Sequence, residues 1–384
     1  MTDDLPPNPA LLPAGLRDLL PPDAEAEASA VETLMTVFAA HGYQRVKPPL
    51  LEFEDSLLAG SGAAVAEQTF RLMDPDSQRM MGLRADTTPQ VARIATTRLA
   101  GASRPLRLSY AGQCLRVRGT QLAPDRQMAQ AGIELIGHDS AEADAETVLV
   151  AAEALAAVGL TRVSFDLTLP MLVPSLLDEA GFAGPDRVAL SRALDRKDAA
   201  AVARHGGTLA GVLTKLLDAA GPAERALAAL AEARLPNLAG ALAQRAAEAV
   251  AVIRTAEPSL RLTVDPVEFR GFRYETGVSV TVFAPGRHEE LGRGGRYVCG
   301  DNEPATGLTL YSDAILRVAP AGQIRPRIFV PLGTGRDIAA RLRSQGFATV
   351  AGLSAAADDA AEAKRLGCTH ILRDGKAALL HSKG

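Results

Sequence analysis

The sequence predicts an α+β fold, in which an antiparallel sheet is flanked by helices and is accompanied by a helical insertion and a small C-terminal α/β domain. Three observations support this. Strand patterns dominate the first 160 residues, a long Ala-rich stretch is almost wholly helical, and strands and helices alternate again after Pro326. The expected domains are a split core of residues 1–170 and 258–322, a helical insertion of residues 171–257, and a short α/β domain of residues 326–384.

Composition narrows the functional classes. The 384 residues are 47% hydrophobic and 22% charged, which excludes a disordered or fibrous chain, and the net charge of −4 gives no broad attraction for nucleic acid. The three cysteines (Cys114, Cys299 and Cys368) are far apart and form no metal-binding spacing, so we expect no disulfide, no metal and no cofactor. The acidic, proline-rich start and the lack of a long apolar run lead us to expect a cytoplasmic protein without membrane contact.

The elements of the first 160 residues follow from periodicity. Apolar residues recur at helical spacing in residues 23–41, 88–100 and 141–158. The two prolines at 48 and 49 assign residues 42–53 to a sheet edge or an interface. In order, we expect a helix at 23–41, an edge segment at 42–53, a hairpin at 69–84, a helix at 88–100, strands at 104–117 and 128–137, and a helix at 141–158.

The remainder of the chain continues the sheet around the insertion. Alternating residues predict strands at 162–170, 259–266 and 277–285. Glycines in GRGGRY predict a hairpin at 292–297, and the apolar spacing of LTLYSDAILRVA predicts a helix at 308–319. The tail alternates strand, helix, strand, helix and strand.

The segment LRADTTPQVAR has two readings. Asp86, Thr87 and Thr88 precede a helical pattern with Pro89 in its first turn, as expected for a helix N-terminus. Alternatively, Asp86 is a carboxylate that receives a ligand ammonium group at the edge of the sheet.

The next two strands and their loop form the most informative segment. Arg116, Arg118 and Arg126 surround the loop, and guanidinium groups suit phosphate or carboxylate recognition. Gln130 and Glu134 are four residues apart on one strand, so both point to the same face and would form a pocket for an amine or imidazole near Asp86. The alternative is a solvated hairpin with scattered charges.

A third group of polar residues lies in EFRGFRYETG, where Arg270, Tyr274 and Glu275 enter a strand. No HExxH, GxSxG or clustered His/Cys set is present, which leaves metal-assisted and triad chemistry without support. We expect His41, His138, His205 and His288 to be surface or satisfied side chains.

In their order along the chain, these segments resemble the catalytic core of class II histidyl-tRNA synthetases over roughly residues 10–320. The matching stretches are GYQRVKPPLLE, LRADTTPQVAR, YAGQCLRVRGTQLAPDRQMAQAGIELIG, RGFRYETG, GRGGRY and PATGLTLYSDAIL. The resemblance implies the class II aminoacyl-tRNA synthetase-like fold, with a dimer segment that Pro49 matches.

The departures from that family fall on groups that bind ATP. Arg116 stays at the α-phosphate position, but Arg118 replaces the glutamate that holds adenine, and Met128 replaces a stacking phenylalanine. Pro124 and Ala314 replace arginines that bind phosphate. Each charged phosphate contact typically contributes about 1.5–3 kcal/mol, so we expect no adenylation.

The amino-acid side of the implied pocket is better kept. The resemblance implies a histidine-type site lined by Asp86, Thr88, Arg116, Gln130, Glu134, Arg270, Tyr274 and Glu275. Glu275 stands where the family has a tyrosine, so it either contacts the imidazole or pairs with Arg270. We expect Glu134→Gln to weaken histidine binding.

A synthetase-like chain with a damaged ATP site and a short tail resembles the regulatory subunits of ATP phosphoribosyltransferase. That resemblance implies a non-catalytic subunit acting in the first step of histidine biosynthesis, needed by a short catalytic subunit in a hetero-octamer of four plus four chains, with a synthetase-like homodimer, histidine feedback and no tRNA. Histidine could bind this chain or the catalytic subunit alone. The alternatives are an active histidyl-tRNA synthetase or another synthetase-like paralogue.

Overall fold

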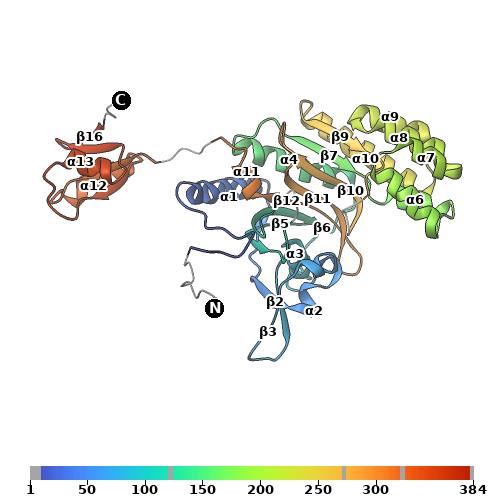
Figure 1. The fold of residues 1–384 in the computed structure, drawn as a ribbon, viewed down its shortest axis with the longest axis horizontal. Helices are drawn as coiled ribbons and strands as arrows, with labels where there is room; N and C mark the ends of the chain where they lie inside the picture. Colours follow the sequence, from blue (N-terminus) through green and yellow to red (C-terminus); the bar gives the residue numbers. More distant parts are fainter. Residues whose placement is uncertain (1–9, 120–123, 270–273, 321–324, 381–384) are drawn as a thin grey trace, which may run out of the picture. The chain divides into compact units, whose positions relative to one another are not determined.

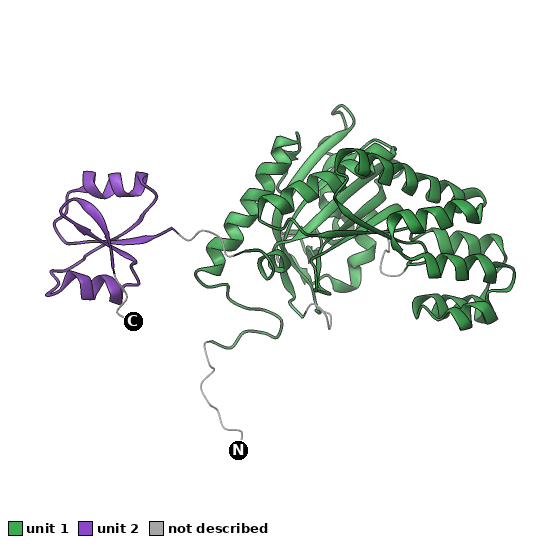
Figure 2. Cartoon of the chain, turned by 90° about the horizontal axis from the view of Figure 1, so that it is seen from above, with its two compact units in different colours: residues 1–320 green, residues 321–384 purple. Residues whose placement is uncertain are grey.

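The computed structural model describes residues 10–119, 124–269, 274–320 and 325–380 (Figure 1). The chain forms two compact units, Met1–Pro320 and Ala321–Gly384 (Figure 2). The mixed fold, with a large antiparallel-rich sheet and helices, confirms the predicted fold class.

A nine-stranded sheet organises the first unit. Its strands, in spatial order, are β1 (Gln44–Arg45), β5 (Leu106–Leu115), β6 (Gln127–Ile136), β12 (Glu303–Tyr311), β11 (Glu290–Cys299), β10 (Glu275–Phe283), β7 (Ser164–Thr168), β9 (Arg261–Asp265) and β8 (Gly221–Pro222). The pairs from β5 across to β7 are all antiparallel, whereas β1 and β9 add in parallel near the two ends. The two-residue β1 at one edge fits the prediction that the proline-interrupted segment stays out of the sheet centre.

Three helices cover one face of this sheet (Figure 1). They are α1 (Asp23–Ala40), α4 (Ala141–Ala157) and α10 (Asn237–Ala256). The predicted apolar positions Leu34, Met35 and Phe38 of α1 are buried in the main core. The hydroxyl of Ser140 caps α4 by accepting from the Ala143 amide at 3.3 Å.

The opposite face carries the smaller elements that border the site. These are β2 (Leu51–Phe53), α2 (Glu54–Leu57), the 3₁₀ helix η1 (Gly60–Gln68), β3 (Arg71–Met73), β4 (Met80–Leu83) and α3 (Thr88–Thr96). The predicted hairpin is β3–β4, and β2 joins it in a three-stranded antiparallel sheet. Arg84 and Gln90 donate to the carbonyls of Pro48 and Pro49 at 3.2 and 2.8 Å, which fixes the proline segment against β5 and α3.

The Ala-rich stretch is helical, as its composition predicts. It contains α5 (Leu172–Glu179), α6 (Gly184–Asp195), α7 (Ala199–His205), η2 (Gly207–Leu209), α8 (Ala210–Ala219), α9 (Ala223–Ala233) and α10. Most of the breaks fall at glycine or proline residues, whereas the break between α6 and α7 falls at residues 196–198, which contain neither. Apolar side chains of these helices, such as Leu213 and Leu230, join the main core.

Two element predictions near the end of the first unit are wrong. GRGGRY lies inside the continuous strand β11 and forms no hairpin, because its glycines allow close approach of neighbouring strands; a Cβ on Gly294 would lie 2.0 Å from the carbonyl oxygen of Gly307. The apolar residues of LTLY extend β12, and only α11 (Ser312–Leu316) is helical. Pairing on both sides of β12 outweighs the local helical spacing.

The second unit alternates strand and helix as predicted. It contains β13 (Arg327–Val330), α12 (Arg336–Ser344), β14 (Ala348–Ala351), α13 (Asp359–Arg365), β15 (His370–Arg373) and β16 (Lys376–Leu379). The sheet order is β14-β13-β15-β16, and β16, which periodicity did not predict, pairs antiparallel with β15.

Within the described residues, no helix is long and apolar enough to cross a membrane, and no cluster of three or more His, Cys, Asp or Glu residues could hold a metal ion. Cys114, Cys299 and Cys368 are free and buried.

Candidate functional site

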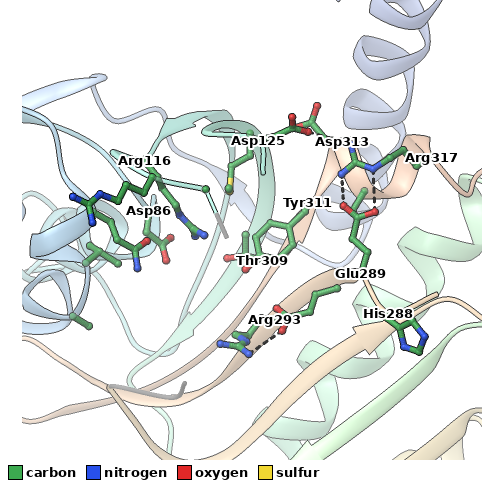
Figure 3. Close-up of a pocket in the computed structure, with 18 of the residues that line it drawn as sticks. Asp86, Arg116, Asp125, His288, Glu289, Arg293, Thr309, Tyr311, Asp313 and Arg317 are labelled. Atoms are coloured by element: carbon green, nitrogen blue, oxygen red, sulfur yellow. Dashed lines mark hydrogen bonds and ion pairs between the residues drawn. The ribbon is translucent and has the colours of Figure 1, made fainter. Parts of the chain in front are cut away.

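A cavity of about 580 Å³ lies on the sheet face that carries α3 (Figure 3). Strands β10, β11 and β12 supply much of its wall, together with η1 and the segments that flank β5, β6 and α3. The polar and charged residues that line it are Gln68, Asp86, Arg116, Arg118, Asp125, Tyr274, Glu275, His288, Glu289, Glu290, Arg293, Thr309, Tyr311, Asp313 and Arg317.

Strand register explains why residues distant in sequence meet in and beneath this cavity. Gly132 of β6 is aligned with Tyr110 of β5 and Thr309 of β12, and Thr309 is aligned with Arg293 of β11. Two residues away along β6, Glu134 is aligned with Gly307. Since residues in register share a sheet face, the floor is built from these rows.

Glu134 lies beneath the cavity wall. Its side chain is 1% exposed and is not part of the lining. Thr88 Oγ1 donates to its Oε1 at 2.9 Å, and the Tyr297 hydroxyl donates to its Oε2 at 2.9 Å. Burial raises the pKa of Glu134 to about 8, so the carboxyl is largely protonated at neutral pH.

Two glycines make room for this buried group. A Cβ on Gly307 would lie 1.9 Å from Glu134 Oε2, and one on Gly132 would lie 2.4 Å from the Tyr110 hydroxyl. The Tyr110 hydroxyl is 2.6 Å from Thr309 Oγ1 and 3.2 Å from Thr88 Oγ1. A hydrogen-bonded network therefore links Glu134 to Thr309, which does line the cavity.

Gln130 is also buried and holds the start of α3. Its Oε1 accepts from the Thr87 amide at 3.1 Å, and the Cys114 thiol lies 3.1 Å from the same oxygen. Like Glu134, Gln130 shares the predicted face but supports the wall instead of forming it.

Asp86 fits both interpretations of LRADTTPQVAR, as part of a helix N-terminus and as a carboxylate available to a ligand. Its Oδ1 accepts from the Thr88 amide at 3.2 Å, as a carboxylate near a helix N-terminus does, and the same side chain lines the cavity. Thr88 begins α3 and uses its hydroxyl on Glu134.

The three arginines around the loop have different positions. Arg116 and Arg118 line the cavity, and Arg116 Nε donates to the Ala85 carbonyl at 3.4 Å. Arg126 is outside the lining and holds the N-terminal segment, because its guanidinium donates to the Ala14 carbonyl at 3.2 Å and its amide donates to Gly15 at 2.8 Å.

Tyr274 and Glu275 form another part of the wall, where β10 begins. Glu275 is aligned with Tyr297, and the rings of Tyr274 and Tyr297 meet edge to face at 5.9 Å. The Tyr274 amide donates to Glu275 Oε2 at 3.3 Å, and burial raises the pKa of Glu275. Arg270, the remaining predicted residue, lies outside the described residues.

Ion pairs at one end of the cavity were not predicted. Arg317 pairs with Glu289 (Figure 3) and lies 3.3 Å from Asp125. Arg17, outside the lining, lies 3.3 Å from Asp313. Arg293 Nη2 lies 2.9 Å from Glu290 Oε1. These residues are scattered over four segments of the sequence, and only the alternation of β11, which places Arg293 on the Gly295 face, could have indicated one of them.

The positions at which the resemblance implies lost ATP contacts lie around this end. Arg118, Met128 and Ala314 line the cavity, and Pro124 is exposed. Asp125 and Asp313 would repel phosphate there, and Arg317 is occupied by carboxylates. The arrangement provides acidic groups for a cation at Asp86 and Glu275, with Arg116 nearby for a carboxylate.

Pro49, the predicted dimer residue, is exposed outside this cavity. Its neighbours Leu50 and Leu51 are also exposed. One face of the β2-β4-β3 sheet is apolar, because register aligns Leu51 with Leu83 and aligns Met81 with both Phe53 and Leu72.

The sequence model of the family described as histidyl-tRNA synthetase matches residues 15–315. A protein from Paramagnetospirillum magneticum, named ATP phosphoribosyltransferase regulatory subunit, is 58% identical over 365 residues, which are 95% of this chain and 96% of the relative. A protein of the same name from Rhodospirillum centenum is 56% identical and covers 98% of each chain.

Solved structures show the same fold. A Bacillus halodurans protein described as an ATP phosphoribosyltransferase regulatory subunit/histidyl-tRNA synthetase superposes with a TM-score of 0.76 over 92% of this chain and 96% of that chain, at 24% identity. Histidyl-tRNA synthetase from Nostoc gives a TM-score of 0.76 over 94% and 90%, at 16% identity.

Proposed function

Because the chain belongs to the family of ATP phosphoribosyltransferase regulatory subunits, which has the histidyl-tRNA synthetase fold, we propose that it activates a short catalytic subunit in the first step of histidine biosynthesis. Family members with 52–58% identity are named as regulatory subunits and not as aminoacylating enzymes. One observation at the site supports the proposal most directly. Where the family resemblance places ATP, the cavity is lined by Met128 and Ala314 and by charged residues that pair with one another.

The direct test combines the chain with the short catalytic subunit. We expect the two to co-purify, and phosphoribosyl transfer to ATP to require both. A catalytic subunit that is equally active alone would contradict the proposal. Native mass spectrometry of the complex tests the proposed four-plus-four hetero-octamer, and fractionation of cells tests the proposed cytoplasmic location.

A second assay tests the alternative of an active synthetase. The chain should support no histidine-dependent exchange of pyrophosphate into ATP, because Arg118, Met128 and Ala314 cannot make the implied adenine and phosphate contacts. Exchange above background, or charging of tRNA, would favour the synthetase.

We further propose that histidine binds this chain in the cavity. Asp86 and Glu275 are two of the carboxylates that line it, Arg116 suits the ligand carboxylate, and Tyr274 adds a ring to the wall. Thr88, Gln130 and Glu134 support this surface from beneath, and the proposed role of Arg270 rests on the family resemblance. Of the two roles for Glu275, the described contacts favour contact with the ligand, because this buried acid lines the cavity.

Calorimetry with histidine separates lining carboxylates from the supporting one. Glu275→Gln and Asp86→Asn should each weaken binding, since loss of a charge-assisted contact costs about 2–5 kcal/mol when its partner stays unpaired. Glu134→Gln tests the expectation from the family resemblance that this carboxyl contributes charge; because the group is largely protonated at neutral pH, we expect the loss of affinity only above about pH 8. Glu232→Gln, on the exposed side of α9, is the matched control and should bind normally. Unchanged affinity in all three variants would show that histidine binds this chain outside the cavity, and absence of binding to the parent chain would place histidine on the catalytic subunit.

Feedback also requires that histidine distinguish two states. A ligand that binds the free chain and the complex equally cannot shift the equilibrium between them. We therefore expect affinities for the isolated chain and for the complex to differ by about 1–3 kcal/mol. Equal affinities would remove the cavity as the feedback sensor even if histidine binds there.

A further inference from the structure

A second cavity, of about 610 Å³, lies at the ends of β7, β9 and β10 and at the turn between β10 and β11. Arg162, Arg261 and Arg287 line it, together with Ser164, Phe283 and His288. The site proposed for histidine does not include these three arginines. His288 lines both cavities.

Strand pairing holds the residues of this second cavity together. Ser164 of β7 is aligned with Arg261 of β9 on one side and with Phe283 of β10 on the other. Arg162 precedes β7 by two residues, and Arg287 lies in the turn after β10. Three separate segments therefore bring one arginine each to the same hollow.

The three guanidinium groups are exposed and lack carboxylate partners within the described parts of the chain. The acids nearest to Arg287 in sequence are used elsewhere, since Glu289 pairs with Arg317 and Glu290 with Arg293. Asp166, the single acid in the lining, accepts from the Thr263 hydroxyl. With three arginines and one aspartate, the hollow has an excess of two positive charges.

We propose that this second cavity binds a phosphorylated small molecule. Guanidinium groups bind phosphate oxygens with paired, directional hydrogen bonds, and a phosphate or pyrophosphate group carries enough negative charge to offset two positive charges, whereas a single carboxylate does not. Ser164 adds a hydroxyl donor, and the half-buried Phe283 offers an apolar surface to the organic part of a phosphate ester.

Isothermal titration of the full chain at low salt tests this, with pyrophosphate, inorganic phosphate and ATP as separate probes. At least one should bind, and Arg261→Gln and Arg287→Gln should each weaken it about tenfold or more. Binding of inorganic phosphate or pyrophosphate identifies the anion as sufficient, and binding of ATP alone identifies an ester. Arg287 lies outside any strand, so that variant keeps the test informative if Arg261→Gln fails to fold.

Two further variants locate the binding. Arg98→Gln, an exposed arginine elsewhere on the chain, should leave affinity unchanged. Arg116→Gln removes a guanidinium from the first cavity and should also leave it unchanged. Loss of binding in Arg116→Gln but not in Arg261→Gln and Arg287→Gln would overturn the proposal, as would absence of binding by all three probes at millimolar concentration.

Discussion

Glu134 shows how burial changes the chemistry of a single residue. Sequence alternation places it correctly on the face of Gln130, but only the packing of Thr88, Tyr110 and Tyr297 around it reveals that it is enclosed. As a consequence, the pKa of this carboxyl group lies well above that of an exposed glutamate.

This shift predicts a pH dependence of stability. The pKa of Glu134 rises from 4.5 to about 8 on folding. The stabilising contribution of this carboxyl to the free energy of unfolding is therefore complete below pH 4.5 and is lost as the pH rises through 8. Glu134→Gln mimics the protonated form and removes this dependence. Between pH 5 and 8, the free energy of unfolding of the variant should therefore gain on that of the parent by up to about 1.4 kcal/mol per pH unit.

Urea unfolding at pH 5, 7 and 9 measures the effect. Glu232→Gln is the control and should follow the parent throughout, because that side chain is exposed. Parallel pH profiles for Glu134→Gln and the parent would contradict the assignment of a buried, protonated carboxyl.

Gly307 provides a second test at the residue scale. A methyl group there would lie 1.9 Å from Glu134 Oε2, so Gly307→Ala should reduce the free energy of unfolding by about 1–3 kcal/mol or more. Gly211, in α8, has open space around it, and Gly211→Ala should instead stabilise by about 0.5–1 kcal/mol. Thermal and urea unfolding compare the two, and a tolerated Gly307→Ala would show that the floor is looser than described.

At the scale of elements, a buried ion pair joins α4 to the sheet. Arg296 of β11 is 7% exposed and Asp144 of α4 is 5% exposed, with 2.8 Å between Arg296 Nη2 and Asp144 Oδ1. Arg296 also donates to the carbonyls of His138 and Ser140 at 3.2 and 3.0 Å. The start of α4 is therefore fixed to the strand that carries Arg293 of the cavity.

Asp144→Asn should lower the free energy of unfolding by about 3 kcal/mol, because it removes the buried counter-ion of Arg296 and leaves only the exposed Asp139, 3.2 Å away. The exposed pair of Glu362 and Arg365 is the matched control. Arg365→Gln should cause no measurable change in the urea midpoint. Equal effects of the two substitutions would contradict the distinction between buried and exposed pairs.

The errors in the element predictions have one physical cause. Across β12 and α11, the apolar residues 308, 310, 315 and 316 fit a helical spacing as well as a strand followed by a short helix. Hydrogen bonding to β6 and β11 decides between these possibilities, and that pairing is invisible to a local pattern. The glycines of β11 were similarly ambiguous, since glycine permits both turns and close strand packing.

At the scale of the whole molecule, the apolar face of the β2-β4-β3 sheet leads us to predict a homodimer. Leu51 is 36% exposed on that face, in the segment of residues 42–53 that the sequence assigns to a sheet edge or an interface. Leu51→Glu should convert a dimer into a monomer, because a carboxylate would be buried in an apolar contact.

Light scattering at micromolar concentration measures this change in mass. Leu238→Glu, which alters an exposed leucine at the start of α10, should leave the dimer intact. A parent chain that is monomeric, or a Leu51→Glu variant that remains dimeric, would contradict the predicted interface.

The sequence by itself determined the α+β class, the positions of most elements and the family, because periodicity and residue order are properties of the chain alone. It also identified Asp86, Arg116, Tyr274 and Glu275, which line the cavity. The tertiary structure decided which residues of one strand face support the wall, as Gln130 and Glu134 do, and which arginines from distant segments converge, as Arg162, Arg261 and Arg287 do. Alternation gives the face of a residue, but its burial and its neighbours depend on strand register and on the helices packed above it.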